Sequence, residues 1–246
     1  MTTLLQLSGA SRHFGGLKAV SRVDLSVDRG EVIGLIGPNG AGKTTLVNVI
    51  TGVHPATAGT VRFAGEDVTR QSPWQAARRG IARTFQIVQP FPEMTVLENV
   101  TAGALFAGGM AYGEHARAAA LEHLRFVGLA DVAGKRAAAL TIAMRKRLEL
   151  AKGLAMNPKL LLLDEVNAGL NSTEIDQALA LIRAIAARGV TILIIEHLMK
   201  VVLNLCSRIV VLHHGKLIAS GDPQSIVRDP RVVQAYLGRR YADAHH

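Results

Sequence analysis

The sequence predicts an α/β fold with a largely parallel central sheet and an inserted helical lobe. Short apolar segments with strand patterns alternate with helix-like segments in the first and last thirds of the chain. Between residues 95 and 155 no strand pattern occurs, and alanine-rich helical segments are interrupted by glycines. The alternation is typical of a parallel sheet covered by helices, and the helical stretch is typical of a lobe added to such a sheet.

The expected core elements follow from local patterns. Residues 31–37 (EVIGLIG) predict a buried strand, and residues 43–50 (KTTLVNVI) predict the helix that follows it. Residues 59–65 (GTVRFAG) predict an edge strand. Residues 72–80 predict a short helix, because a serine cap and a first-turn proline precede a glycine stop. Strands are expected at residues 159–164 and 191–196, with a helix at residues 172–187 between them. A final strand-like run is expected at residues 208–220.

The lobe is expected to hold two or three helices. Thr95 and Glu98 have the spacing of a capping box, which predicts a helix start at this point. Gly108-Gly109 and Gly128 interrupt the helical pattern and predict the breaks between helices.

Composition excludes several classes of protein. The 246 residues suffice for one large domain, and the most apolar runs stop at acidic residues, well short of the ~20 residues of a membrane span. The N-terminus lacks a secretion signal pattern, and the single Cys206 fits a core thiol, so we expect a cytoplasmic protein. The net charge is +9, but the basic residues are scattered along the chain, and only Arg145 to Arg147 form a basic run. This pattern favours a solvated basic surface over a nucleic-acid site.

A phosphate-binding loop is the strongest motif. Residues 37–45 (GPNGAGKTT) match G-x-x-x-x-G-K-[ST] between a predicted strand and a predicted helix. The glycines let backbone N–H groups turn toward phosphate, Lys43 would reach the β- and γ-phosphates, and the Thr44 hydroxyl would ligate Mg²⁺. The nucleotide-contacting residues expected here are Gly37, Pro38, Asn39, Gly40, Ala41, Gly42, Lys43, Thr44 and Thr45. The motif predicts a P-loop NTPase core.

Two acidic residues complete the predicted site. Asp164 and Glu165 follow the apolar run of residues 160–163 and stand at the carboxyl end of the predicted strand, where sites form in parallel sheets. Asp164 would hold Mg²⁺, and Glu165 would polarise the attacking water. No Asn-Lys-x-Asp tetrad for guanine occurs in the sequence, so ATP is the expected nucleotide.

With these motifs the chain resembles, over essentially its full length, the ATPase subunits of ATP-binding-cassette transporters. The resemblance implies one ATPase domain over residues 1–246. Its nucleotide-binding α/β core would comprise residues 1–88 and 156–246 and include an antiparallel β subdomain. The helical lobe would comprise residues 89–155.

The resemblance implies roles for three further residues. Phe14 in RHFGG stands where the family stacks an aromatic ring on adenine, although by itself it also fits a core position. Gln86 in ARTFQ matches a catalytic glutamine that contacts Mg²⁺ and the membrane subunit; taken alone it is a polar strand end. His197 in TILIIEHL matches the histidine that reaches the γ-phosphate; taken alone it is a helix-start residue.

The resemblance is closer to the branched-chain amino-acid importer subgroup. FGGLKAVSRVDLSV, ARTFQIVQPFPEMTVLENV and SGDPQSIVRDPRVVQAYLG all resemble its ATPase subunits. This implies membrane permease subunits as partners, a periplasmic solute-binding protein acting indirectly, and a second ATPase subunit, as a heterodimer or alternatively a homodimer. It also implies a peripheral location at the cytoplasmic face of the inner (cell) membrane, and no nucleic-acid partner.

Residues 140–144 (LTIAM) stand where the family has its signature LSGGQ. In the family dimer this segment closes over the γ-phosphate bound by the opposite subunit. Thr141 keeps a hydroxyl, whereas Ile142 and Ala143 add Cβ atoms where glycine allows close approach. We interpret the segment as a weakened signature, and the alternative is that Leu140, Ile142 and Met144 pack inside the lobe.

The predicted function is ATP hydrolysis that powers import of branched-chain amino acids or related small solutes. One alternative is a soluble cassette ATPase that acts on nucleic acid or ribosomes, and such proteins usually carry long coiled-coil insertions or tandem cassettes. Another is a small-molecule kinase, which would need an acceptor pocket and a lid that the sequence does not reveal.

Overall fold

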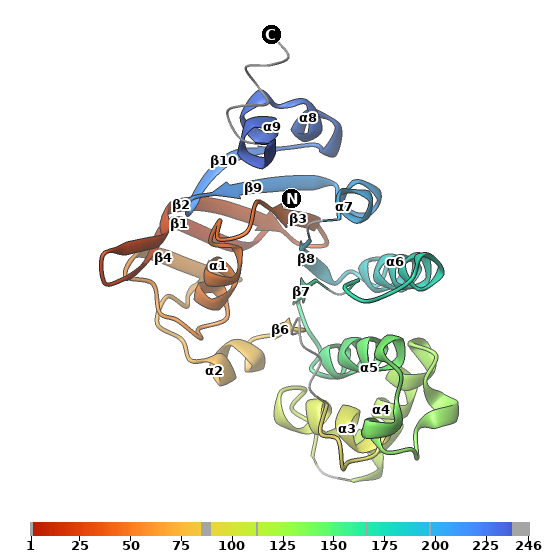
Figure 1. The fold of residues 1–246 in the computed structure, drawn as a ribbon. Helices are drawn as coiled ribbons and strands as arrows, with labels where there is room; N and C mark the ends of the chain where they lie inside the picture. The colour runs from red at the N-terminus through yellow and green to blue at the C-terminus, as the bar shows by residue number, and fades with distance from the viewer. Residues whose placement is uncertain (1, 85–89, 112, 166, 197, 238–246) are drawn as a thin grey trace. The chain divides into compact units, whose positions relative to one another are not determined.

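The chain divides into two compact units (Figure 1). The computed structural model describes residues 2–84, 90–111, 113–165, 167–196 and 198–237. The first unit comprises residues 1–73 and 191–246, and the second comprises residues 74–190.

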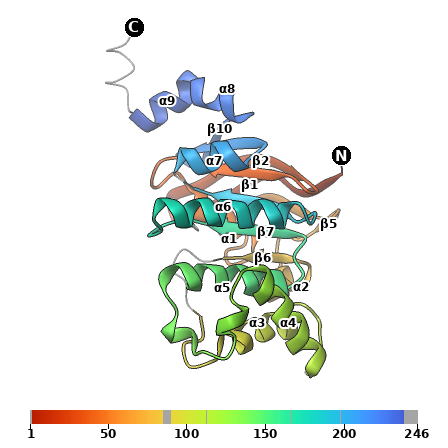
Figure 2. The same cartoon turned by 90° about the vertical axis from the view of Figure 1, so that its right-hand side faces the viewer.

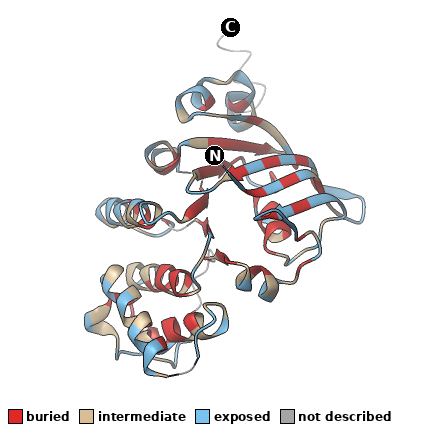
Figure 3. Cartoon of the chain, turned by 180° about the vertical axis from the view of Figure 1, so that it is seen from behind, coloured by how far each residue is buried: buried red, intermediate tan, exposed pale blue. Residues whose placement is uncertain are grey.

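An antiparallel sheet in the first unit contains β1 (Thr3–Phe14), β2 (Leu17–Asp28), β4 (Ala58–Phe63) and β5 (Glu66–Asp67), in the order β2-β1-β4-β5. Buried and exposed residues alternate along much of β1 and β2, as expected for strands with one face in the core (Figure 3). This sheet is the antiparallel subdomain that the family resemblance implied. The expectation that residues 59–65 form an edge strand is wrong, because β4 pairs with β1 on one side and β5 on the other.

A second group of strands in the first unit is mainly parallel. β3 (Val32–Ile36) pairs in parallel with β8 (Thr191–Ile195) and β9 (Arg208–His213), and β10 (Lys216–Gly221) runs antiparallel to β9. The strand predicted at residues 191–196 is confirmed as β8, and all five of its residues are buried, as expected for an inner strand of a parallel sheet. The helices of this unit are α1 (Lys43–Ile50), α7 (Met199–Leu205), α8 (Pro223–Arg228) and α9 (Pro230–Leu237).

In the second unit, β6 (Ile81–Arg83) pairs in parallel with β7 (Leu160–Asp164). Helix α2 (Pro73–Arg78) precedes β6, and α6 (Ser172–Ala186) follows β7. Asn171 caps α6 with a capping box, in which its side-chain oxygen accepts from the Glu174 N–H at 2.9 Å. Asparagine is among the preferred N-cap residues, which explains why α6 begins at this point.

Three helices pack together to form the predicted lobe (Figures 1 and 2): α3 (Val96–Phe106), α4 (Glu114–Phe126) and α5 (Ile142–Ala155). The capping box at Thr95 and Glu98 is confirmed, with their reciprocal bonds at 3.1 and 2.7 Å. Helix α3 must approach α5 closely, because a Cβ atom added at Gly103 would lie 2.8 Å from the Lys152 carbonyl oxygen.

Candidate nucleotide-binding site

The loop between β3 and α1 has a backbone that requires glycine. Gly37 has a φ of 151°, and a Cβ atom there would lie 2.0 Å from the Leu212 carbonyl oxygen. Gly42 has a φ of 102°, and a Cβ atom there would lie 2.3 Å from the Ala19 carbonyl oxygen. A side chain is therefore excluded at both positions, and the loop keeps the close backbone turn that a phosphate cradle needs.

Helix α1 begins directly at the end of this loop. Gly42 is its N-cap and has no side chain to cap the helix. The Leu46 N–H donates to the Gly42 carbonyl at 2.9 Å in the first turn of α1, and the backbone N–H groups of a first helical turn point out of the end of the helix. These N–H groups and the positive end of the helix dipole form an anion-binding site of the kind that holds phosphate.

Lys43 lies inside the loop rather than out in solvent. Its ammonium group donates to the carbonyl oxygens of Gly37 at 2.6 Å and Pro38 at 3.1 Å. The side chain is buried, whereas Asn39, Gly40 and Thr44 are exposed. A cation held at the centre of an exposed loop of N–H donors fits a nucleotide phosphate group.

Phe14 lies at the end of β1 and is 40% exposed, so it is not a core residue. The Arg12 guanidinium carbon is 4.6 Å from the centre of its ring, and the His54 ring meets it edge-on at 5.3 Å. The ring is thus held in place by two neighbours while part of it stays accessible for stacking.

In the second unit, Asp164 ends β7 and is buried. Its Oδ2 atom accepts a hydrogen bond of 2.7 Å from Nη2 of Arg83, which is the last residue of β6. Glu165 follows with a φ of 47°, a left-handed conformation that non-glycine residues adopt at a cost. The carboxylate of Asp164 therefore stands at a strand end next to a strained residue, as is common at functional sites.

Residues 140–144, which the family resemblance aligns with the signature, lie at the start of α5. Thr141 is the N-cap of α5, and its hydroxyl accepts from the Met144 N–H at 3.3 Å. Leu140 is buried, but Ile142 is 61% exposed, so the alternative in which all the apolar side chains pack inside the lobe is wrong for Ile142. An exposed isoleucine thus occupies the first turn of the helix.

Sequence reasoning missed two basic residues that contact the acidic pair, Arg83 at Asp164 and Lys146 at the backbone of Glu165. Both partners are distant in sequence, so no local pattern marks them. Gln86 and His197 lie outside the described residues, so their expected roles remain predictions.

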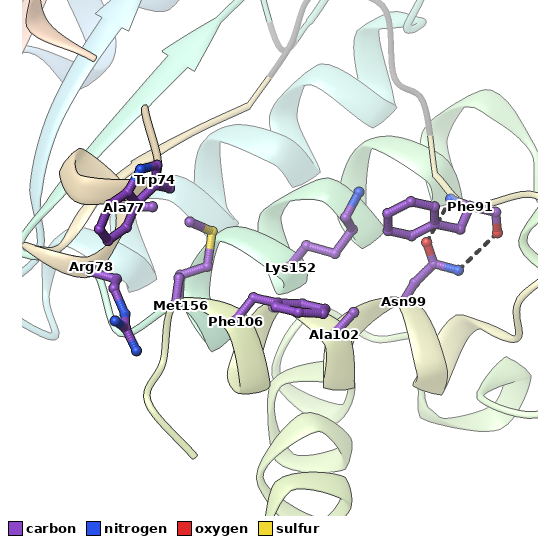
Figure 4. A pocket seen from close by; sticks show the side chains of 11 residues that line it. Trp74, Ala77, Arg78, Phe91, Asn99, Ala102, Phe106, Lys152 and Met156 are labelled. Carbon is purple, nitrogen blue, oxygen red and sulfur yellow. Dashed lines mark hydrogen bonds between the residues drawn. The ribbon is translucent and has the colours of Figure 1, made fainter. Parts of the chain in front are cut away.

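An apolar groove of about 520 Å³ in the second unit was also missed (Figure 4). Three exposed aromatic residues line it: Trp74 at 62%, Phe91 at 54% and Phe106 at 80%. Asn99 fixes the backbone at Phe91, because its side chain accepts from the Phe91 N–H and donates to the Phe91 carbonyl. The Lys152 ammonium lies 5.6 Å from the centre of the Phe91 ring. Large aromatic surfaces left in water in this way are typical of interaction sites.

None of the described helices is long and apolar enough to cross a membrane.

Comparison with known sequences identifies the family. The sequence model of the ABC transporter family matches residues 20–168, and that of the branched-chain amino acid ATP-binding cassette transporter matches residues 216–242. The high-affinity branched-chain amino acid transport ATP-binding protein BraF of Pseudomonas aeruginosa is 39% identical, over an alignment 249 positions long that covers 96% of this chain and 98% of BraF. The corresponding LivG protein of Escherichia coli K12 is 39% identical with the same coverage.

Two solved structures share the fold. A nucleotide-free ATP-binding cassette from an ABC transporter superposes with a TM-score of 0.88, and a cassette in its ADP conformation superposes with 0.89. Each is 34% identical in sequence and covers 97% of this chain and 100% of its own. The predicted α/β fold of a P-loop NTPase is thereby confirmed. The chain therefore belongs to the ABC transporter family, as one of its ATP-hydrolysing cassettes.

Proposed function

We propose that this chain is the ATP-hydrolysing subunit of an importer for branched-chain amino acids or related small solutes, bound peripherally at the cytoplasmic face of the cell membrane. The observation that carries the solute class is the match of residues 216–242 to the branched-chain cassette family, added to the cassette match over residues 20–168. BraF and LivG, which are similar along almost their whole length, are named as branched-chain amino acid transport proteins.

ATP would bind with its phosphates on the loop at residues 37–45. Lys43 and the α1 N-terminus would stabilise their charge, and Phe14 would stack on adenine. Mg²⁺ prefers hard oxygen ligands, which the side chains of Asp164, Thr44 and Gln86 would provide. When bound, Mg²⁺ would neutralise charge on the β- and γ-phosphates. Two features support the fit: the glycine cradle that no Cβ could enter, and the buried carboxylate at the end of β7.

Glu165 would orient the attacking water and accept its proton, while His197 would contact the γ-phosphate. Thr141 would contact the nucleotide bound by the opposite ATPase subunit. This chain would form a heterodimer with a second kind of ATPase subunit. The alternative is a homodimer, in which the weakened segment at residues 140–144 would serve both nucleotide sites. ATP binding would draw the two subunits together, and hydrolysis would reopen them. A periplasmic solute-binding protein would deliver the solute to the permease.

The apolar groove at Trp74, Phe91 and Phe106 would receive an apolar helical segment of a permease subunit. Three aromatic side chains and the stem of Lys152 provide the contact area that such helix-in-groove recognition uses. Phe91 follows Gln86 by five positions, so nucleotide chemistry and permease contact would act on one short stretch of chain.

Reconstitution in proteoliposomes tests this function. The chain would be assembled with its permease subunits, its second ATPase subunit and solute-binding protein, and ATP hydrolysis measured with leucine, isoleucine, valine or urea. We expect stimulation by the branched-chain amino acids and not by urea. Stimulation by urea alone would contradict the solute class, and absence of ATP hydrolysis with every solute would contradict the ATPase assignment in this assembly.

The groove is tested separately by Phe106→Asp, which places a charge on its most exposed ring. We expect loss of co-purification with the permease while ATP binding by the isolated subunit is unchanged. Val227→Asp alters an exposed apolar residue of α8 outside the groove and is the matched control. Equal co-purification of both variants with the permease would reject the groove as the docking surface.

A further inference from the structure

Arg83 and Asp164 form a buried ion pair within the second unit. The two side chains are 10% and 6% exposed, and Nη2 of Arg83 lies 2.7 Å from Oδ2 of Asp164. Parallel pairing of β6 with β7 places Arg83 beside Leu162, two residues before Asp164. Thr84 extends this pairing, because its N–H donates to the Leu162 carbonyl at 2.9 Å and its hydroxyl accepts from the Asp164 N–H at 3.3 Å. The strand pair therefore aims the guanidinium at the carboxylate.

A buried carboxylate needs a compensating charge, and Arg83 supplies one. The guanidinium does not lose its charge at any physiological pH. Mg²⁺ approaching the same carboxylate meets a cation already in contact with it. In a site shielded from water the repulsion between the two cations is strong, and it opposes metal binding for as long as the ion pair persists.

We propose that Arg83 is a counter-ion that stands in for the metal at Asp164. It neutralises the carboxylate when the site is empty, it must leave Oδ2 when Mg²⁺ arrives with the nucleotide, and it thereby raises the Mg²⁺ concentration that nucleotide binding requires. The inference rests on the proposed role of Asp164 as a Mg²⁺ ligand.

Two other roles for Arg83 make different predictions. If the ion pair served stability only, removing Arg83 would change unfolding but not the Mg²⁺ requirement. If Arg83 stayed bound and oriented Asp164 toward the metal, removing it would raise the requirement. Only a counter-ion that the metal displaces gives a lower requirement when it is removed.

The experiment uses the full chain and a fluorescent ATP analogue, whose binding is titrated against free Mg²⁺ and compared with binding in EDTA. We expect Arg83→Gln to lower the half-saturating Mg²⁺ concentration about tenfold, the scale of one lost charge contact. We also expect the Tm of Arg83→Gln to lie below that of the unaltered protein when Mg²⁺ is absent. This difference in Tm should shrink when Mg²⁺ and ATP are added, because the metal then compensates the charge of Asp164. An unchanged or raised Mg²⁺ requirement would overturn the proposal.

Two further variants keep the outcome decisive. Arg83→Lys retains a charge but cannot reproduce the planar contact, so it should lower the Mg²⁺ requirement by about threefold. If Arg83→Gln does not fold, this variant carries the test, and an unchanged or raised requirement in it rejects the proposal. Asp164→Asn should remove most of the Mg²⁺ dependence of binding. If Asp164→Asn instead leaves that dependence intact, the proposed metal role of Asp164 fails, which is a result distinct from failure of the Arg83 inference.

Discussion

The ammonium group of Lys146 donates a hydrogen bond of 3.2 Å to the carbonyl oxygen of Glu165. Lys146 lies in the second turn of α5, whose N-cap is Thr141, while Glu165 follows β7 with a φ of 47°. A non-glycine residue in this conformation costs of order 1–3 kcal/mol, so surrounding contacts must hold it. The bond therefore connects the helix that begins just after residues 140–141 to the backbone from which the proposed water-orienting carboxylate projects.

Lys146→Met is expected to lower ATP turnover about 3- to 10-fold with less than about twofold change in ATP affinity, since one charged hydrogen bond that holds the Glu165 backbone is lost. Steady-state hydrolysis and equilibrium ATP binding would be measured side by side. Lys135→Met removes one exposed lysine of the same unit and should change neither quantity. A Lys146 variant whose turnover equals that of Lys135→Met would remove the proposed coupling.

Glu165→Gln is expected to preserve ATP binding and lower turnover by about 10²-fold or more, because the water loses its base while the phosphate loop is untouched. Turnover should be measured in the assembled transporter, with ATP affinity measured in the isolated subunit. Glu122→Gln makes the same change on an exposed face of α4 and serves as the control. Near-normal turnover of Glu165→Gln would remove this residue from its assigned role.

Lys43→Ala is expected to weaken Mg-ATP binding about 10- to 100-fold, because the ammonium that would contact phosphate in the ground state is lost. Titration calorimetry of the isolated subunit measures this directly. The control Lys216→Ala removes an exposed lysine of β10 and should leave affinity unchanged. Unaltered affinity in Lys43→Ala would count against the phosphate-loop assignment.

Restoring glycine at Ile142 and Ala143 together is expected to raise both turnover and ATP-driven dimerisation of the isolated subunit, which we expect to hydrolyse ATP slowly and to dimerise poorly. Glycine would let the α5 N-terminus approach the nucleotide of the opposite subunit more closely. Since Ile142 is largely exposed, the stability cost should be that of helix propensity, about 1 kcal/mol per glycine.

Analytical ultracentrifugation with ATP and a hydrolysis assay together test the glycine variant. A heterodimer with a partner that carries a glycine-containing signature should hold one competent site, built on Lys43, Asp164 and Glu165 of this chain. Unfolding of the variant without any gain in turnover or dimerisation would show that the segment serves lobe packing instead.

Phe14→Ala is expected to weaken ATP binding about 5- to 20-fold through lost stacking, whereas Phe14→Trp should retain the affinity. The Arg12 guanidinium and the His54 ring support this side chain, so the tryptophan should find the same neighbours. The readout is the ratio of affinities for ATP and inorganic triphosphate, because only ATP carries a base. Equal losses for both ligands would show that Phe14 acts on the loop and not on adenine.

The sequence alone was enough to locate the glycine-rich loop at residues 37–45, the start of α1 and the acidic pair. The reason is that each is a contiguous pattern: a glycine loop, a helix start and a buried run that ends in Asp164 all act within a few residues. The capping box at Thr95 and the break after Phe106 were predictable for the same reason. The long strands β1 and β2 were not predicted, because their alternation is broken by register shifts and becomes clear only when the two strands pair.

Only the tertiary structure decided which distant side chains meet. Arg83 and Asp164 are 81 positions apart, and Lys146 and Glu165 are 19 apart, so no local pattern relates them. Likewise, the apolar side chains of residues 140–144 are compatible with either burial or exposure when only the sequence is considered. The packing of α5 buried Leu140 and left Ile142 in solvent, because a helix start points successive side chains in different directions and only its neighbours determine which of them are covered.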